Sequence, residues 1–302
     1  MIIIKILCIG HATYDITIPI SKFIAENTKS IVNERISCGG GPASTAAYLL
    51  GKWGSDVSFV GIIGNDINGK KILKEFEEVN VDTSYVEVRE GYETPASYII
   101  SSKEKGTRTI LIYQKNKSEM KDIDINFIPD IILIDGQEYN LSKKILEKYK
   151  DAISVIDAGK VTDTNIELCK MVNYVVCSKE FAENLSNMKF DFENKETLKN
   201  IFMYLKEKFH NNIVITLENK GCLYEINNEI KIMNAIKVET VDSTGAGDIF
   251  HGAFVYGLSI NLPYEKIIKL AVVTSGLSVT RLGGRNSMFE LDEIKEKYEE
   301  FR

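Results

Sequence analysis

The sequence is poor in the residues that build metal centres and disulfide frameworks. Its 302 residues include only three histidines, His11, His210 and His251, and no two of them are spaced as an H-x-x-x-H pair. A histidine-built zinc site is therefore not expected. The cysteines are odd in number and form no C-x-x-C pair; they are Cys8, Cys38, Cys169, Cys177 and Cys222. This pattern predicts buried, reduced thiols in a cytoplasmic protein.

The sequence also lacks a basic tract and a long apolar run. It has 37 Lys and Arg against 43 Asp and Glu, a net charge of -6. This balance argues against nucleic acid or an anionic membrane as partner, although a local basic pocket could still hold a phosphate. No apolar run approaches membrane-spanning length. The N-terminal "MIIIKILCIG" has no basic leader or small-residue cleavage site, so we expect a first β-strand there and not a signal peptide.

The composition is that of an ordinary globular protein, with 44% hydrophobic and 26% charged residues. Short apolar runs alternate with helical patterns along the chain, which predicts an α/β fold with a mostly parallel sheet covered on both faces. We expect a single domain over residues 1–302. The expected strands cover residues 2–10, 56–64, 130–135, 152–157, 173–178 and 212–217, and the clearest expected helices cover 41–54 and 68–80.

Two stretches depart from this rhythm and show alternating patterns, residues 14–38 and 95–114. The second contains "SKEKGTRT", which is typical of a hairpin turn at Gly106. Together they predict a small antiparallel sheet that projects from the main domain as a lid over a cleft.

The stretch "VDSTGAGDIFHGAFVYGL" (241–258) predicts a loop that enters a helix. Free amides and the helix dipole at such a start attract an anion. Gly245, Ala246 and Gly247 leave the backbone bare enough for a phosphate to approach, and Asp248 falls in the first turn. The alternative is an ordinary helix start in which an aspartate satisfies orphan amides. Oxygen ligands on the nearby Asp242 and Thr244 weaken that alternative.

Other glycine-rich stretches differ in what they indicate. "GNDINGKK" (64–71) resembles a phosphate loop, but Lys71 stands where Ser or Thr is needed, so an ordinary charged helix start is favoured. The first turn, "CIGHATYD", lacks G-x-G-x-x-G, which weakens a nicotinamide oxidoreductase hypothesis. "SCGGGPASTAA" (37–47) fits either a tight strand-to-helix turn or backbone that faces a ligand closely.

The glycine cluster "GGGPA" near residue 40 and "DSTGAGD" near residue 245 together resemble the two signatures of the PfkB (ribokinase-like) carbohydrate kinases. Their order and separation match, and the likeness runs from about residue 4 to 290. The resemblance implies a Rossmann-like α/β/α sandwich with a β-sheet lid. It also implies transfer of the γ-phosphoryl group of ATP, with Mg²⁺, to a hydroxyl of a sugar or nucleoside.

The resemblance implies a role for each matching position. Asp248 resembles the catalytic base, and the amides of 245–247 resemble the anion hole for the phosphoryl group. Asp15 and the glycines Gly39, Gly40 and Gly41 resemble the sugar-binding residues, and Thr216 and Gly221 resemble the adenine-nucleotide loop. The positions that resemble a monovalent-cation site, expected to hold K⁺, are Asp242, Thr244, Ser278, Arg281 (through its carbonyl), Gly283 and Ser287.

Four positions depart from the family pattern. Thr13 and Ser44 stand where ribose-specific members carry asparagine, which puts ribose in doubt. Ser178 replaces an asparagine and Glu218 replaces a glycine on the nucleotide side, which puts the strength of ATP binding in doubt. The segments "TPASYII", "GTRTIL" and "CSKEFA" are more similar to the ketohexokinase and fructokinase side of the family.

Further residues are weaker candidates. Gln137 is a candidate substrate contact, Lys160 a candidate contact to ATP phosphates, and Arg108 in the lid could reach an acidic group of a ligand. His251 is expected to be structural. The alternatives to a sugar kinase are a nucleoside kinase and a non-catalytic protein that senses sugar or nucleotide. Pairing of exposed lid edges predicts a homodimer, with lid-face candidates Tyr14, Ile16, Ile18 and Ile31.

Overall fold

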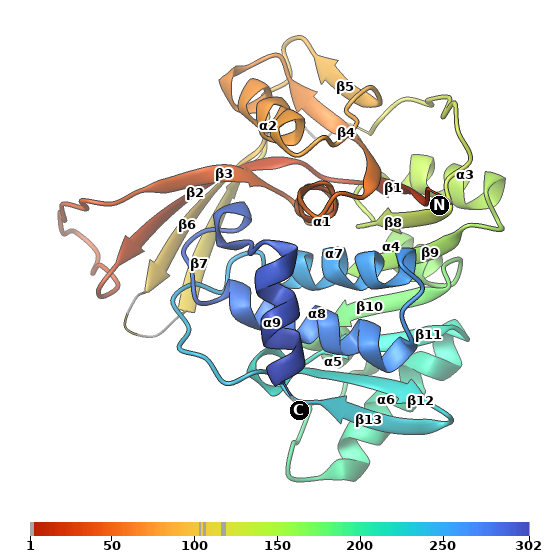
Figure 1. Ribbon diagram of the computed structural model, residues 1–302. Helices are drawn as coiled ribbons and strands as arrows, with labels where there is room; N and C mark the ends of the chain where they lie inside the picture. Colours follow the sequence, from red (N-terminus) through yellow and green to blue (C-terminus); the bar gives the residue numbers. More distant parts are fainter. Residues whose placement is uncertain (1–2, 103, 105–106, 116–118, 302) are drawn as a thin grey trace.

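The computed structural model describes residues 3–102, 104, 107–115 and 119–301, and its core is a nine-stranded sheet (Figure 1). All neighbouring strands are parallel except at one edge, where two antiparallel pairs follow β11. Across the sheet the strands are β13 (Glu229–Met233), β12 (Cys222–Ile226), β11 (Asn212–Thr216), β10 (Tyr174–Ser178), β9 (Ile153–Ala158), β8 (Ile131–Ile134), β1 (Lys5–Ile9), β4 (Asp56–Gly64) and β5 (Val86–Arg89).

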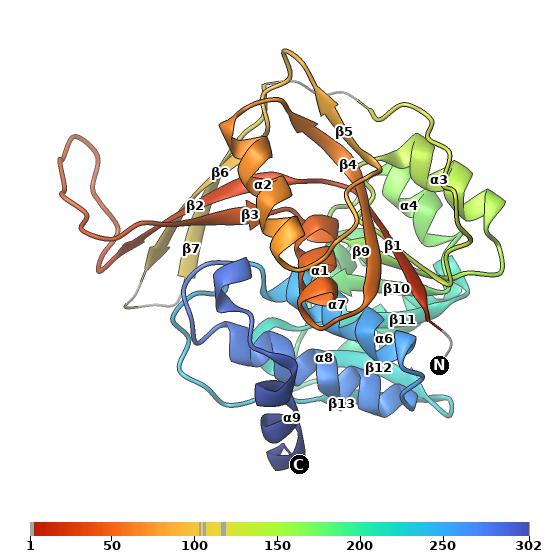
Figure 2. The same cartoon turned by 45° about the horizontal axis from the view of Figure 1, so that its top comes forward.

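Helices cover both faces of this sheet, which is why its strands are almost continuously apolar. In β1, Ile6 and Cys8 pack on one face, while Leu7 and Ile9 pack on the other. The first face carries α1 (Pro42–Lys52), α2 (Ile67–Glu78), α7 (Ala246–Ser259), α8 (Tyr264–Ser278) and α9 (Leu291–Glu300). The second carries α3 (Tyr139–Lys148), α4 (Asp163–Cys169), α5 (Lys179–Ser186) and α6 (Lys195–Phe209). Figure 2 shows α1 and α7 on one side of the sheet and α3 and α4 on the other.

A second sheet of four strands forms the lid and projects to one side of the main sheet (Figure 1). Its strands, in order, are β3 (Ile36–Gly40), β2 (Thr13–Ile20), β6 (Ala96–Ser102) and β7 (Thr107–Tyr113). The pairs β2–β3 and β6–β7 are antiparallel, whereas β2–β6 is parallel. The lid is therefore mixed and not wholly antiparallel, because its two hairpins lie side by side in the same direction.

The predicted fold class, an α/β/α sandwich with a β-sheet lid, is confirmed. The expected strands and helices are present with ends that shift by a few residues. Gly106, the expected turn residue of the lid hairpin, lies outside the described residues. In the described part of the chain, no helix combines the length and the apolar character that crossing a membrane requires.

Candidate active site

The candidate site forms where the N-terminus of α7 meets the carboxyl ends of the central strands, beneath the lid. Gly245 precedes α7 with a φ of 74°, a left-handed conformation that glycine adopts without strain. α2, α4, α5 and α6 begin with a side chain that accepts a hydrogen bond from a backbone amide, whereas no described side chain caps α1, α3 or α8. Among the described residues no side chain caps α7 in this way. The amide of Ala246 donates to the carbonyl of Ser243 at a long 3.4 Å, whereas the amides of Gly245 and Gly247 have no backbone partner in the described structure and are available to an anion.

Asp248 lies in the first turn of α7 and is half-buried. Burial raises the pKa of its carboxyl well above the ordinary range, and the carboxylates of Asp157, Asp15 and Asp135 raise it further. Arg108 on β7 opposes them. The guanidinium of Arg108 also donates to the hydroxyl of Ser243, so a lid strand is tied to the loop before α7. A carboxyl with a raised pKa beside available amides suits a general base.

Asp15 lies on the inner face of the lid. The strand registers place Asp15 opposite Ser97 and Arg108 opposite Ser101, four residues further along β6 and on the same face. The carboxylate is 9% exposed, and its Oδ1 has no hydrogen-bond partner within the described chain. Burial raises the pKa of Asp15 to about 6. A buried, unpartnered carboxylate oxygen has the chemistry to accept a hydrogen bond from a ligand hydroxyl.

The glycines of β3 are required by their neighbours. A Cβ on Gly40 would lie 2.1 Å from Oδ2 of Asp15, and a Cβ on Gly39 would lie 2.4 Å from Nη1 of Arg285. The amide of Gly39 donates to Glu75 (2.8 Å to Oε2), which in turn pairs with Arg285 at 2.9 Å. The absence of side chains at Gly39 and Gly40 therefore lets Arg285 and Asp15 pack closely against β3, and a ligand contact by these glycines stays a prediction.

Arg285, which is buried, and Glu75, which is half-buried, form an ion pair that sequence reasoning missed. Arg285 is 4% exposed, and its Nη2 donates to the hydroxyl of Ser44 and, at 3.3 Å, to the Ser44 carbonyl. Ser44, a predicted substrate residue, therefore has its hydroxyl engaged by Arg285. Thr13, the other such position, is buried and donates to the carbonyl of Pro95 at 3.1 Å.

Two further carboxylates, also missed, lie at the carboxyl ends of the central strands, Asp135 directly after β8 and Asp157 just before the end of β9. Asp135 accepts hydrogen bonds from the amides of His11 (2.7 Å), Ala43 (3.3 Å) and Gln137 (3.0 Å), and it thereby ties β1, α1 and β8 together. The signal was present in the sequence, because "DIILID" and "AISVID" each carry an aspartate as a buried strand ends, and such ends meet at one edge of a parallel sheet.

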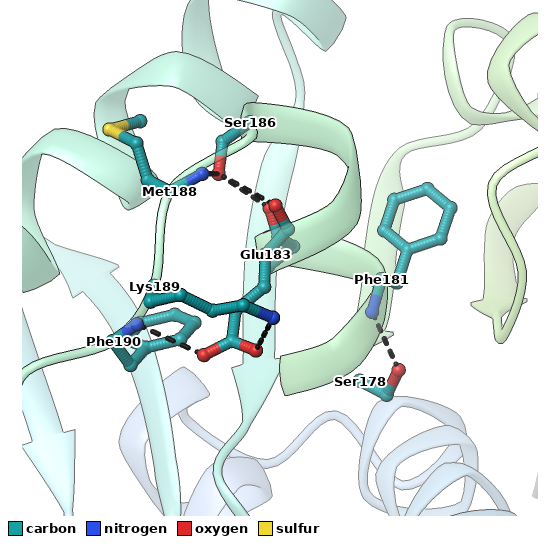
Figure 3. Close-up of polar contacts among 8 residues, drawn as sticks. Ser178, Phe181, Glu183, Ser186, Met188, Lys189 and Phe190 are labelled. Atoms are coloured by element: carbon teal, nitrogen blue, oxygen red, sulfur yellow. Dashed lines mark hydrogen bonds and ion pairs between the residues drawn. The ribbon is translucent and has the colours of Figure 1, made fainter.

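The predicted nucleotide residues lie at the ends of β10 and β11. The hydroxyl of Ser178 caps α5 by accepting from the amide of Phe181 at 3.1 Å (Figure 3). Glu183 on the same helix accepts from Lys189 Nζ at 2.9 Å and from the amide of Phe190 at 3.0 Å, which fixes the segment that follows α5. The hydroxyl of Thr216 donates to the carbonyl of Cys177 at 3.3 Å.

Glu218, where the family resemblance implies a glycine, has a left-handed backbone conformation that favours glycine. Its φ is 55°, and Gly221 three residues later has a φ of 93°. The loop therefore retains its glycine-type shape at the cost of strain on a non-glycine residue. Gln137 and Lys160, the weaker candidates, are both exposed.

The predicted cation residues form a tightly bonded loop pair. Asp242 is buried, its Oδ1 accepts from the amide (3.0 Å) and hydroxyl (2.7 Å) of Thr244, and its Oδ2 accepts from the amide of Gly283 at 2.9 Å. The hydroxyls of Ser278 and Ser287 donate to the carbonyls of Ser275 and Gly284. The guanidinium of Arg281 faces outward to Glu293 at 3.2 Å. Throughout the described residues, no three or more His, Cys, Asp or Glu side chains are grouped to hold a metal.

Comparison with known proteins identifies the same family. The profile described as pfkB family carbohydrate kinase matches residues 4–290. The ribokinase of Lactococcus lactis is 27% identical over 87% of this chain and 86% of that protein, and the nucleoside kinase of Methanocaldococcus jannaschii is 23% identical over 99% and 98%.

Solved structures share the fold. The ribokinase of Thermotoga maritima superposes with a TM-score of 0.83 at 24% identity, over 99% of this chain and 100% of that one. The ribokinase of Arabidopsis thaliana, solved in complex with ribose and ATP, superposes with a TM-score of 0.82 at 20% identity, over 99% of each chain.

Proposed function

Because the chain belongs to the pfkB family of carbohydrate kinases and is therefore a phosphotransferase, we propose that it transfers the γ-phosphoryl group of ATP to a hydroxyl of a sugar, with Asp248 as general base. The observation that carries this proposal is the uncapped start of α7 with a half-buried carboxyl of raised pKa in its first turn. Such an arrangement supplies a proton acceptor and anion-binding amides at the same place.

The residues of this chain divide the work between them. Asp15 accepts a hydrogen bond from a sugar hydroxyl through its unpartnered Oδ1, and Asp248 takes the proton of the attacking hydroxyl. The amides of 245–247 face the charge that develops on the transferred group. Arg108, which already reaches the loop before α7, contributes positive charge from the lid. Mg²⁺ bound with ATP would neutralise phosphate charge, a role that needs no dedicated protein cage.

The proposed acceptor is ribose, fructose or a related ketose. The engaged hydroxyl of Ser44 and the buried Thr13 lie where ribose-specific members carry asparagine, so ribose is the first of these acceptors to be tested. A nucleoside is the second candidate, supported by the similarity to the nucleoside kinase of Methanocaldococcus jannaschii. We further propose activation by K⁺ at the Asp242 loop and a homodimer formed through the lids.

The test is a panel of sugars and nucleosides, measured twice. A thermal-shift screen finds the compounds that stabilise the native state, and an ATP-consumption assay then asks which of them are phosphorylated. We expect turnover of at least one sugar. The substitution Asp248→Asn should lower kcat by about 10² to 10⁴, the usual contribution of positioned proton transfer, while the thermal shift by that sugar persists.

Asp151→Asn is a matched control. Asp151 is an exposed aspartate just before β9, at the opposite edge of the sheet from the site, and its substitution should leave kcat unchanged. Full turnover by Asp248→Asn would remove the proposed base. Binding of a compound without its turnover would identify a non-catalytic sensor. Glu218 on the nucleotide side would fit such a protein, because it puts the strength of ATP binding in doubt.

A further inference from the structure

His251 lies on α7 one turn after Asp248, and its imidazole is enclosed by three elements. The side chain is 5% exposed. Its Nδ1 lies 2.7 Å from the carbonyl oxygen of Gly247 and 3.2 Å from Oδ2 of Asp157 on β9. Its Nε2 lies 3.1 Å from the carbonyl oxygen of Val176 on β10. In the described structure, both ring nitrogens thus face oxygen acceptors.

This arrangement determines the protonation of the ring. A neutral imidazole carries one N–H, so one ring nitrogen would oppose the lone pairs of an oxygen. An imidazolium donates from both nitrogens and satisfies both sides. A buried charge is tolerated when it is paired and hydrogen-bonded. Burial and, to a smaller extent, the Asp135 charge raise the pKa of Asp157, and the charge of His251 lowers it, so the pair supplies the opposite charges together.

We propose that His251 is held as an imidazolium paired with Asp157, and that it is a positioning residue for the phosphoryl-transfer site. The inference rests on the proposed function, because its target is Asp248. The carbonyl of Gly247 belongs to the same peptide unit as the amide of Asp248. A bond from His251 to that carbonyl therefore fixes the peptide that leads into the catalytic carboxyl.

The second effect of His251 is electrostatic. Asp248 is surrounded by Asp157 on β9, Asp15 on β2, Asp135 after β8 and Arg108 on β7. After burial, the Asp157 charge is the largest contribution that raises the pKa of Asp248. The positive ring of His251, paired with Asp157, offsets the negative charge of Asp157 and so reduces its effect on the pKa of Asp248. Without it, Asp157 would stand uncompensated and the pKa of Asp248 would rise further.

The protonation state is measurable without any substrate. The full chain, labelled with ¹⁵N-histidine, should show His251 with both ring nitrogens protonated near neutral pH in long-range ¹H–¹⁵N spectra. Only three histidines need assignment, and His210→Asn serves as control because His210 has a φ of 61°, which asparagine tolerates. A His251 ring with a single protonated nitrogen would overturn the proposal, whatever the enzyme's activity.

Kinetics then separates positioning from a structural role. The value of kcat should fall at low pH as Asp248 is protonated. His251→Asn should raise the midpoint pH of this fall by about one unit, the size of shift that one nearby charge causes. Adding Asp157→Asn to that variant should bring the midpoint back toward wild type, because the uncompensated charge is gone. A uniform loss of kcat at every pH, with no recovery in the double variant, would refute the positioning role. Absence of turnover by the wild type would instead contradict the assignment of Asp248 as the base. The ¹H–¹⁵N spectra would then still test whether the His251 ring is an imidazolium.

Discussion

At the scale of single residues, the environment of each aspartate determines its chemistry. Asp242 uses both oxygens within its own loop pair, and Asp135 accepts three backbone amides. Asp15, in contrast, keeps one oxygen without a partner in the described structure. These aspartates therefore differ in role although their side chains are identical. An aspartate whose oxygens all accept hydrogen bonds from the chain stabilises the fold, whereas one with a free oxygen can bind a ligand.

The free oxygen of Asp15 predicts a pH-dependent affinity for sugar. Burial raises the pKa of Asp15 to about 6, so the carboxyl is ionised above that pH and protonated below it. A sugar hydroxyl donates best to the ionised form, so KM should fall as pH rises through about 6 and should rise as pH falls below it. The measurement is KM for the preferred sugar across this range. Asp15→Asn should weaken binding and make KM insensitive to pH, whereas a flat KM in the wild type would show that Asp15 does not bind the sugar.

Sequence reasoning identified the residues whose roles are visible in local patterns. Asp248 and Gly245 stand in one recognisable turn, and the structure brings them to a helix start as expected. Arg285 and Glu75 could not be found in this way. They lie 210 residues apart, and only the packing of the loop after α8 against β3 and α2 makes them an ion pair.

At the scale of elements, the main sheet was predictable and the lid less so. The apolar run of β4 was predicted with the bounds that the structure has, because a strand buried on both faces is apolar throughout. The antiparallel edge strands β12 and β13 were not predicted, since β12 is buried over only its first three residues and β13 contains no buried residue. The parallel pairing of β2 with β6 was also missed, because their register is set by contacts between distant segments.

The loop before α7 predicts activation by a monovalent cation. Asp242 lies three residues before Gly245, and its carboxylate joins the Thr244 and Gly283 segments through hydrogen bonds. We expect K⁺ on the oxygen atoms of this loop pair to hold the amides in the orientation that faces the developing charge. Activity should therefore rise several-fold when K⁺ replaces a bulky organic cation at constant ionic strength and saturating Mg·ATP.

Asp242→Ala tests this prediction through a ratio of rates. The variant also loses the hydrogen bonds of Asp242, so its rate will fall in both salts, and the informative quantity is the ratio between them. We expect that ratio to approach one in Asp242→Ala and to stay at the wild-type value in Asp292→Ala, which alters an exposed carboxylate on α9. Equal wild-type rates in both salts would exclude activation by K⁺.

At the scale of the whole molecule, the lid leaves an apolar outer face without cover. The register places Tyr98, Leu111 and Tyr113 on the face opposite Arg108, and their exposed fractions are 44%, 59% and 47%. β7 is also an edge strand, so its outer backbone groups are open to pairing.

Of the expected lid-face residues, Ile16 and Ile18 share this face and are half-buried, and Ile31 lies beyond the strands. Tyr14 is a correction: it is 5% exposed, within contact of Lys71 on α2, and therefore unavailable to a partner.

The exposed lid face predicts a homodimer that a single charge would disrupt. Burial of Tyr98, Leu111 and Tyr113 against a second copy would remove apolar surface from water and cover the open edge of β7. Light scattering after size exclusion should therefore give the mass of a dimer at micromolar concentration, and Leu111→Glu should give the 34.0 kDa monomer.

Ile128→Glu is the matched control, because Ile128 is 78% exposed but lies before β8, away from the lid. A wild-type chain that stays monomeric well above micromolar concentration would refute the interface, and a dimer that survives Leu111→Glu would place it on another surface. Since Asp15 and Arg108 lie on the inner face of the same sheet, a dimer that steadies the lid should also lower KM for the sugar, and Leu111→Glu should raise KM more than it lowers kcat.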